Sequence, residues 1–526
     1  MVQAGTPGSG AGLREEVRRI GEDRDWTALE AWCDQFWPVL DTPAVKEVLV
    51  VLRSVPEREL LARPRLMMFV AVAYYAAFSS DDVELRPFVE QYLDSATRVA
   101  STMDVAREDS ATTLVVSGSA ALVSLRYRGQ FAESVAFGER LEARLARLRS
   151  GPRGGWLPLQ QGITHSLTGD FERAAGEYRQ AHQQASLLQV PAAATLRAAA
   201  AANLAMISAH TGNGATAREW LGELRSIPLP AGWISHLVGM AGAVAEGWEA
   251  LDRYDSMTLE EILEITGDGT APVEIWPFIN PLASAHGLLW GDPAASLAHL
   301  DTVRFDHARL LTAQGTARWV LRRARLDLLI ATGRANRALR YLGETGQRVR
   351  WLAVPAARLR LLSGKYAAAR TLAADGDSAA PRDRLQLLLI GAVAAARLGL
   401  RVEAVARARE AMRERSSDEV LSLALLSEEH RDEIFRLTDV PLTDMAAERL
   451  AGVRPVFPER VELVELTNRE QAVLGKLDGD GTVADIAREL VVSASTVRTQ
   501  VQSLYRKLGV STRQEAVLRA YELGLL

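Results

Sequence analysis

Hydrophobic positions recur with helical spacing over most of this chain. From about residue 13 to about residue 437, long segments rich in Ala, Leu, Arg and Glu alternate with short breaks at Gly, Pro or Asp. The sequence of this stretch lacks alternating apolar runs flanked by turn dipeptides, the pattern that marks β-strands. The pattern therefore predicts an all-α protein.

A short motif recurs within this helical stretch. A glycine is followed after two residues by an aromatic side chain in some copies, and after five residues by Ala or Ser; the best copy has Gly169, Phe171 and Ala174. The copies begin at Gly129, Gly169, Gly212, Gly291, Gly333, Gly364 and Gly399, at intervals of 40, 43, 79, 42, 31 and 35 residues. The interval of 79 spans about two periods, which indicates that one copy has degenerated.

Each copy predicts a helix hairpin. The glycine ends the first helix in a left-handed conformation, and the small residue lets the second helix approach closely. Such units cannot bury their apolar faces alone, so they stack. The motif resembles the turn and second helix of tetratricopeptide repeats (TPR), although the spacing is longer and more variable. We expect residues 13–437 to form a TPR-like α-superhelix that serves as a sensor or interaction domain. A non-repetitive helical bundle is the alternative.

The flanking segments differ from the helical stretch. Residues 1–12 are rich in glycine and uncharged, without the basic start and apolar run of a signal peptide, so we expect them to be disordered. Residues 438–461 contain Pro441, Pro455 and Pro458, which interrupt helices, and this segment is predicted to be a linker.

Four short helices are predicted in residues 462–526. Thr467 and Glu470 have the spacing of a capping box and begin the first helix. The second covers 483–490. The third, capped by Ser493 or Ser495, ends at Gly509, and the fourth starts at Ser511 or Thr512 and reaches about Leu523.

The third of these helices has two distinct sides. An apolar stripe contains Val497, Val501, Leu504 and Leu508, and the other side contains Ser495, Arg498, Thr499, Gln502 and Arg506. From Val491 to Arg513 there are four basic residues and no acidic ones. A donor-rich, locally positive helix face is typical of a helix that enters the DNA major groove.

This segment resembles the LuxR/NarL-type helix-turn-helix DNA-binding domain. The family pattern appears as Leu466-Thr467-x-Arg469-Glu470, Ile486-Ala487, Ser493-x-x-Thr496-Val497-Arg498, Lys507-Leu508-Gly509-Val510, Arg513 and Gly524-Leu525. One departure is Gln500, which stands where the family usually has His. By helical angle this position flanks the apolar stripe, so we expect the change to affect packing more than base reading.

The resemblance implies roles for particular side chains. Arg498, Thr499 and Gln502 are expected to face the bases of double-stranded DNA. Thr496, Arg506, Lys507 and Arg513 are expected to contact the DNA backbone, and Ser495 joins them because it lies at the start of the same polar face. The resemblance also implies a homodimer on DNA, often formed through the fourth helix.

A looser resemblance covers the N-terminal part. The segments 25–32 and 55–66 are similar to the region that follows the ATPase module of MalT-like large LuxR regulators. Those regulators carry a P-loop, whereas Gly-x-x-x-x-Gly-Lys-Ser/Thr does not occur in this sequence. We therefore expect no nucleotide hydrolysis, no cofactor and no enzymatic activity.

Composition narrows the remaining possibilities. The net charge is −5, so any contact with nucleic acid must come from a local basic face. Cys33 is the single cysteine and the eight histidines lack metal-ligand spacing, so neither an intrachain disulfide nor a metal site is predicted. We expect a cytoplasmic protein that does not enter a membrane.

An effector site is predicted in the middle of the chain. The aromatic segment 273–282 breaks helical regularity, and with neighbouring tryptophans it suggests a pocket lined by Trp233, Trp248, Trp276, Phe278 and Trp290. The alternative is that these side chains are core residues between repeats.

The resulting hypothesis is a transcription regulator controlled by a protein, peptide or small-molecule effector. The alternative function is a TPR-type interaction scaffold whose helix-turn-helix does not bind DNA specifically.

Overall fold

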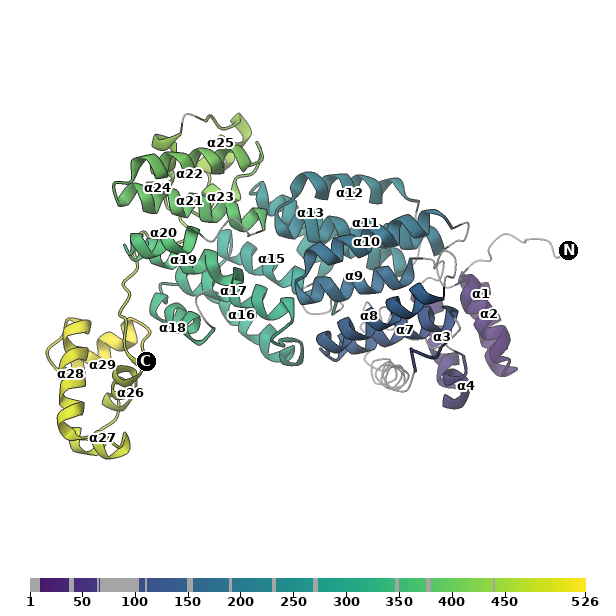
Figure 1. Cartoon of the computed structure of the whole chain (residues 1–526), viewed down its shortest axis with the longest axis horizontal. Helices are drawn as coiled ribbons and strands as arrows, with labels where there is room; N and C mark the ends of the chain where they lie inside the picture. Colours follow the sequence, from purple (N-terminus) through teal and green to yellow (C-terminus); the bar gives the residue numbers. More distant parts are fainter. Residues whose placement is uncertain are drawn as a thin grey trace. The chain divides into compact units, whose positions relative to one another are not determined.

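The computed structural model describes residues 10–36, 42–63, 66, 104–108, 111–148, 155–188, 192–228, 233–267, 273–345, 350–374, 380–438 and 440–526. In these ranges the chain forms α-helices, short 3-10 segments and turns, and no strand (Figure 1). The prediction of an all-α protein is thus confirmed. No helix in the described ranges has the length and apolar character needed to cross a bilayer.

The helices follow one another closely along the chain. Those before residue 270 are α1 (Gly10–Glu22), α2 (Trp26–Phe36), α3 (Thr42–Arg53), α4 (Glu57–Leu61), α7 (Ala111–Tyr127), α8 (Phe131–Arg147), α9 (Trp156–Thr168), α10 (Phe171–Ser186), α11 (Ala192–Thr211), α12 (Gly214–Ser226), α13 (Trp233–Asp252) and α14 (Ser256–Thr266). They are followed by α15 (Trp276–Leu289), α16 (Pro293–Asp306), α17 (Thr316–Ala331), α18 (Ala335–Thr345), α19 (Ala353–Leu362), α20 (Tyr366–Ala373), α21 (Pro381–Arg397), α22 (Arg401–Glu414), α23 (Leu421–Ala424), α24 (Glu428–Leu437), α25 (Asp444–Ala451), α26 (Asn468–Leu477), α27 (Val483–Glu489), α28 (Ala494–Leu508) and α29 (Arg513–Glu522).

The chain divides into two compact units. Unit 1 comprises residues 1–251, 255–283 and 301–321, and unit 2 comprises 252–254, 284–300 and 322–526. Of the N-terminal segment expected to be disordered, residues 1–9 lie outside the described residues and the rest begins α1. Residues 67–103 of the expected repeat domain also lie outside them.

The glycine motif forms the predicted helix ends at most of its copies. Gly129, Gly169, Gly212, Gly333, Gly364 and Gly399 all have φ between 73° and 91°, the left-handed region. After each of them, the next residue's N–H donates to a carbonyl five positions back, for example Asp170 to His165 at 3.0 Å. This hydrogen bond closes the end of a helix with a left-handed residue. The small residue of these copies is fully buried, in Ser134, Ala174, Ala217, Ala338, Ala369 and Ala404.

Gly291 departs from the expected left-handed conformation. It has no positive φ, and its N–H and that of Trp290 both donate to the His286 carbonyl, at 3.3 and 2.9 Å. The proline at 293 favours extended backbone in Asp292, and the Asp292 carboxylate accepts from Ala294 N–H at 2.9 Å. The chain therefore passes into α16 by a different turn.

The degenerate copy predicted between Gly212 and Gly291 lies at Tyr254. This residue has φ of 58° although it is not a glycine, and the following Asp255 N–H donates to Ala250 at 2.9 Å, as in the glycine copies. Asp255 then caps α14 by accepting from Thr258 N–H at 3.3 Å. The turn geometry has thus persisted here without the glycine that identifies it in the sequence.

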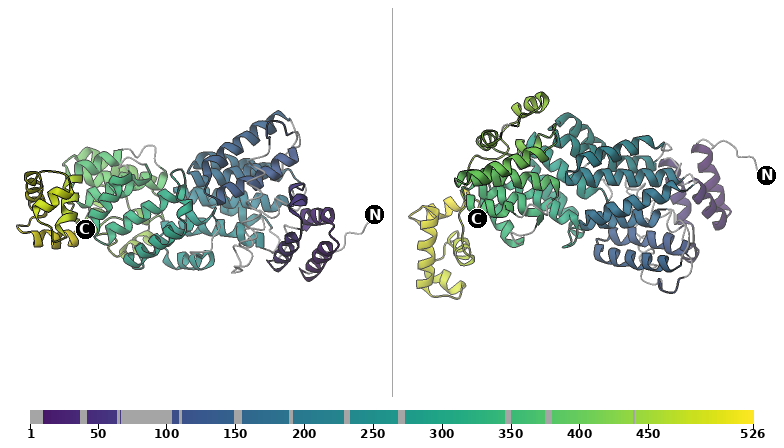
Figure 2. Two further views of the ribbon diagram at one scale, coloured as in Figure 1. Left: turned by 90° about the horizontal axis from the view of Figure 1, so that it is seen from below. Right: turned by 45° about the horizontal axis from the view of Figure 1, so that its top comes forward.

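Helices that are neighbours in sequence pack on one another. In unit 1, α9, α10, α11 and α12 lie side by side in chain order, and in unit 2 the same holds for α19, α20, α21 and α22 (Figures 1 and 2). This local packing agrees with the predicted hairpins. The TPR-like superhelix built from them stays a prediction.

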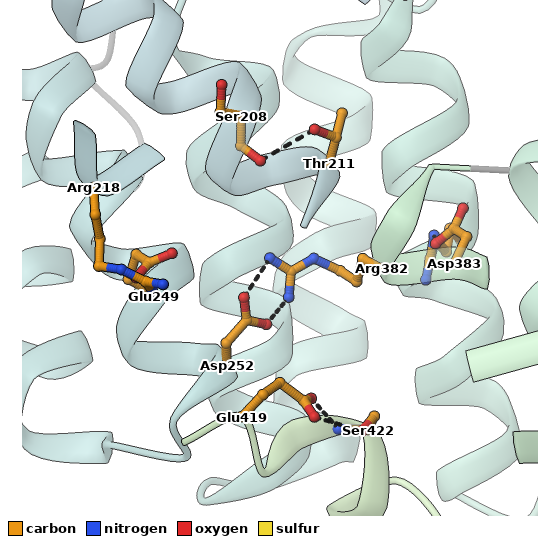
Figure 3. A network of polar contacts seen from close by, with 10 residues as sticks. Ser208, Thr211, Arg218, Glu249, Asp252, Arg382, Asp383, Glu419 and Ser422 are labelled. Carbon is orange, nitrogen blue, oxygen red and sulfur yellow. Dashed lines mark hydrogen bonds and ion pairs between the residues drawn. The ribbon is translucent and has the colours of Figure 1, made fainter. Parts of the chain in front are cut away.

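A polar cluster fixes the turn after α13 within unit 2 (Figure 3). The Arg382 guanidinium binds the Asp252 carboxylate through two N–H groups, one of them at 2.9 Å, and Val420 N–H donates to the Asp252 carbonyl at 2.7 Å. Glu419 accepts from the N–H and the hydroxyl of Ser422, both at 2.6 Å. Burial and the nearby Asp252 charge raise the pKa of Glu419 to about 7.

The left-handed turns yield a prediction in which one substitution has opposite effects at two glycines. At Gly364 a Cβ meets no atom within 4 Å but φ is 73°, so Gly364→Ala should lower the free energy of unfolding by about 1 kcal/mol. At Gly343, inside α18, a Cβ also meets nothing, and Gly343→Ala should raise it by about 0.5 kcal/mol. Urea unfolding of the full chain measures both, and a gain of stability from Gly364→Ala would contradict the account.

Candidate nucleic-acid interface

The C-terminal domain (residues 462–526) contains four helices, each begun by a side-chain cap. Thr467 and Glu470 form the predicted capping box of α26, and Ser493 caps α28 by accepting from Thr496 N–H. Thr512 begins α29, with Glu515 completing a capping box. Helix α28 ends at Gly509, where φ is 68°, so the predicted helices of this domain are confirmed.

A third capping box, at the start of α27, was missed in the sequence. Thr482 accepts from Asp485 N–H at 3.3 Å, and Asp485 accepts from Thr482 N–H at 3.0 Å, which fixes the start of α27. The box is harder to find in the sequence because Asp occupies the position usually held by Glu or Gln.

One side of α28 is buried in the core of this domain. Val497, Leu504 and Leu508 are at most 4% exposed, and Val501 packs against the same core. The partners come from the other three helices, chiefly Val473, Leu474, Leu477, Ile486, Ala487, Ala516 and Ala520. The apolar stripe predicted for this helix is therefore confirmed.

The opposite side of α28 faces solvent. Arg498, Thr499, Gln502 and Arg506 are all exposed. Within the described part of the chain, no residue forms a hydrogen bond or ion pair with the side chains of Arg498, Gln502 or Arg506. Near the start of the helix, the Ser493 hydroxyl lies 2.8 Å from the hydroxyls of both Ser495 and Thr496. The Thr499 hydroxyl donates to the Ser495 carbonyl of the same helix at 3.1 Å. The expected base-contacting residues thus lie together on one exposed face.

Lys507 is bound inside the domain. Its ammonium donates to the Glu470 carboxylate at 2.6 Å and to the Glu465 carbonyl at 2.8 Å. Glu470 is 3% exposed and also accepts from the Ser503 hydroxyl at 2.7 Å. Burial raises the pKa of Glu470, but these hydrogen bonds and those from Thr467 outweigh it and hold the pKa at about 2. The pair fixes α28 to the start of α26.

Arg513 is also engaged within the domain. Its guanidinium donates to the carbonyls of Leu477 at 2.9 Å and Gly481 at 2.6 Å, and to that of Gly479. These three carbonyls lie at the end of α26 and in the loop before α27. In this structure Arg513 therefore holds the loop, whose Asp-Gly-Asp-Gly sequence has little regular structure of its own.

The turn between α27 and α28 contains a strained residue. Val491 has φ of 53° and is 89% exposed. A positive φ is unfavourable for a β-branched side chain, and no burial of Val491 offsets this cost.

The aromatic residues proposed for an effector pocket lie in three places. In unit 1, the rings of Trp248 and Phe278 lie 4.9 and 5.2 Å from that of His210. Trp276, also in unit 1, packs on His307 at 4.4 Å, and Trp290, in unit 2, packs on Tyr254 at 4.6 Å. Trp248, Trp276 and Phe278 are buried, while the side chain of Trp233 lies outside the described residues. The pocket stays a prediction.

Known proteins are similar in sequence to this same C-terminal domain. Residues 464–520 match the family model described as bacterial regulatory proteins, luxR family. The HTH-type transcriptional regulator MalT of Serratia proteamaculans (strain 568) is 45% identical over 69 residues, which is 13% of this chain and 8% of that protein. The HTH-type transcriptional regulator MalT of Yersinia pestis (strain Pestoides F) is 42% identical over 94 residues, which is 18% of this chain and 9% of that protein. The matches therefore span less than a tenth of the length of these relatives.

The buried Glu470 predicts a pH-dependent contribution to stability. Because the pKa of Glu470 in the folded chain is depressed from 4.5 to about 2, its contribution is present above pH 4.5 and is lost as the pH falls toward 2. We expect Glu470→Gln to lower the free energy of unfolding by about 2 kcal/mol at pH 7 and by less at pH 3, as measured with urea. Glu489→Gln, at an exposed site on α27, is the control with little expected effect. An equal loss from Glu470→Gln at both pH values would refute the depressed pKa.

Val491 predicts a stabilising substitution. Asparagine tolerates the left-handed conformation, so Val491→Asn should raise the free energy of unfolding by about 1 kcal/mol. Val492→Asn, one residue later with an ordinary φ, should not stabilise the chain. Thermal unfolding of the C-terminal domain within the full protein compares the two, and equal effects would show that strain at Val491 is not the cause.

Proposed function

We propose that this protein, whose residues 464–520 form a LuxR-family helix-turn-helix domain, is a transcription regulator that binds double-stranded DNA. The observation that carries this proposal is the free polar face of α28. Its donors are exposed while the other side of the helix is buried in the domain core. A helix held in this way can enter the major groove without unfolding or rearranging the domain.

The base contacts are assigned to Arg498, Thr499 and Gln502. Arginine presents two parallel donors that match the acceptors on the major-groove edge of guanine, and glutamine can pair with adenine. All three residues lie in the first nine positions of α28, the part of a recognition helix that usually reaches the bases.

Contacts to the DNA backbone are assigned to residues around this face. Ser495, Thr496 and Arg506 offer hydroxyl and guanidinium donors beside it. Lys507 also joins this set, but its ammonium is shared with Glu470, so its contribution to affinity should be smaller than that of Arg506. We assign Arg513 an indirect role, because its guanidinium holds the loop between α26 and α27.

A homodimer on DNA is part of the proposal. The outer side of α29 exposes two large side chains, Leu518 at 62% and Tyr521 at 55%. Exposed apolar groups on one short helix are suited to pairing with the same helix of a second copy. A two-fold dimer would then read a two-fold DNA site.

Control by an effector is assigned to the helical stretch from residue 13 to residue 437. The support is the helix hairpins in the described part of this stretch, because stacked hairpins in repeat proteins create extended binding surfaces. We propose that this part senses a protein, peptide or small molecule and acts without catalysis of its own.

The test of DNA binding uses the full chain and a duplex selected from a random-sequence pool. We expect affinity to fall steeply with salt, because neutralised phosphates release counterions. Arg498→Ala should cost about 1–3 kcal/mol of discrimination between the selected duplex and one with the contacted base pair changed. Arg506→Ala should instead weaken binding to both duplexes equally.

The matched control is Arg409→Ala on α22, an exposed arginine whose loss changes the net charge by the same amount. The affinity of the Arg409→Ala variant for both duplexes should equal that of the parent chain. If no duplex is selected, or if Arg498→Ala binds both duplexes as the parent does, the proposal fails in favour of an interaction scaffold.

A further inference from the structure

Both ends of the C-terminal domain lie against one side chain of α18. The Asn336 amide N–H groups donate to the carbonyls of Glu462 at 3.0 Å and Leu523 at 3.2 Å. Its carbonyl oxygen accepts from Val464 N–H at 2.7 Å. Asn336 is 2% exposed, so these three bonds satisfy a polar group that would be costly to bury alone.

Arg340, one turn further along α18, binds the end of the chain. Its guanidinium donates to the carbonyls of Gly524 at 2.7 Å and Leu525 at 3.0 Å. These carbonyls follow α29, where the unpaired carbonyls of a helix end carry partial negative charge. A cation at this place is favourable, and its fork of donors fixes the direction of the backbone that it binds.

A third contact reaches the recognition helix. The Glu465 carboxylate pairs with Arg360 of α19 at 2.7 Å and with Lys365 at 2.5 Å, which holds the pKa of Glu465 below its usual range. The backbone carbonyl of Glu465 accepts from Lys507 of α28 at 2.8 Å. One residue thus links α19 to the helix that carries the exposed donors.

The segment before the C-terminal domain, residues 438–461, is bound at several points to other parts of unit 2. Arg449 of α25 donates to the carbonyl of Arg253 at 2.7 Å, and Arg454 donates to those of Leu289 at 2.8 Å and Gly291 at 2.6 Å. Phe457 is buried beneath the Arg358 guanidinium, 4.7 Å from ring centre to carbon. The stretch predicted to be a linker therefore has few residues free to act as a tether.

These contacts leave the outer faces of the domain open. Arg498, Thr499 and Gln502 of α28 remain exposed, as do Leu518 and Tyr521 of α29. The contacts with α18 use backbone groups at the two ends of the domain, and the contact with α19 uses the Glu465 side chain, which precedes α26. They therefore block neither the face assigned to DNA nor the face assigned to a second copy.

We propose that α18 and α19 form a docking surface whose occupant is this chain's own C-terminal domain, clamped by Asn336 and Arg340. The domain then turns with the helices of unit 2 as one body. The docking itself does not depend on the proposed function, but its consequence for DNA rests on it. Pairing through Leu518 and Tyr521 of one short helix leaves the angle between the two C-terminal domains adjustable. A unit 2 docked on each domain restricts that angle, so a narrower range of half-site spacings is bound.

The clamp is tested by the rotational freedom of the C-terminal domain in the full chain. A rigid fluorophore is attached at Asp480→Cys, an exposed loop position, in a Cys33→Ser background. In the parent chain, the time-resolved fluorescence anisotropy should decay only with the slow tumbling of unit 2 as a whole. The variant Asn336→Ala with Arg340→Ala should gain a fast phase with a correlation time several-fold shorter.

Two further variants make the result specific. Glu465→Lys reverses an exposed ion pair without disturbing a core, and it should also gain the fast phase. Arg337→Ala, on the exposed side of α18, should behave as the parent does. A fast phase already present in the parent would overturn the proposal, as would clamp variants that decay like the parent.

The consequence for DNA is measured separately. Half-sites of a selected duplex are moved apart by single base pairs, and the clamp variants should tolerate more spacings than the parent and Arg337→Ala. If the anisotropy result holds and no variant binds DNA, the docking stands and the proposed function fails. If all variants bind DNA with the same spacing preference, the docking does not set the position of α28.

Discussion

The burial of one side of α28 is the constraint on which the rest of the C-terminal domain and the proposed function depend. Val497, Leu504 and Leu508 pack into the core made by α26, α27 and α29, so the helix has one possible rotation about its axis. With 3.6 residues per turn, that rotation directs Arg498 and Gln502 away from the core. The Glu470–Lys507 pair prevents the helix from sliding along its axis. A rigid, donor-rich surface follows without any contribution from a ligand.

Contacts to backbone groups at helix ends recur throughout the rest of the molecule. Left-handed residues close the first helix of most hairpins, and the side chains of Asp170 and Asp255 then cap the starts of α10 and α14. The same chemistry operates over long distances where Asn336, Arg340 and Arg513 bind carbonyls of other segments. Unsatisfied helix ends are thus the sites at which one element is attached to the next. In our account the C-terminal domain is joined to its neighbours by the same means.

Short-range features were predictable from the sequence. The capping box of Thr467 and Glu470 and the apolar stripe of α28 involve residues within one or three turns of each other, and both were found where the pattern indicates. Long-range contacts were not predictable. Asn336 bonds to residues 126 and 187 positions away, and a single asparagine on a helix gives no periodic signal. Likewise, nothing in the sequence distinguishes Arg513, which binds a loop, from Arg498, which is free. At Tyr254 the turn is present without its glycine, and at Gly291 the glycine is present without that turn.

The central claim is that α28 enters the major groove of DNA. A photoreactive benzophenone side chain placed at Gln502 of the full chain tests it most directly, with the same group at Leu518 as the comparison. On irradiation with a selected duplex, the probe at position 502 should form cross-links at a fixed base position, and the probe at 518 should form none with DNA. The absence of cross-links from position 502, or cross-links scattered along the duplex from both positions, would contradict the account.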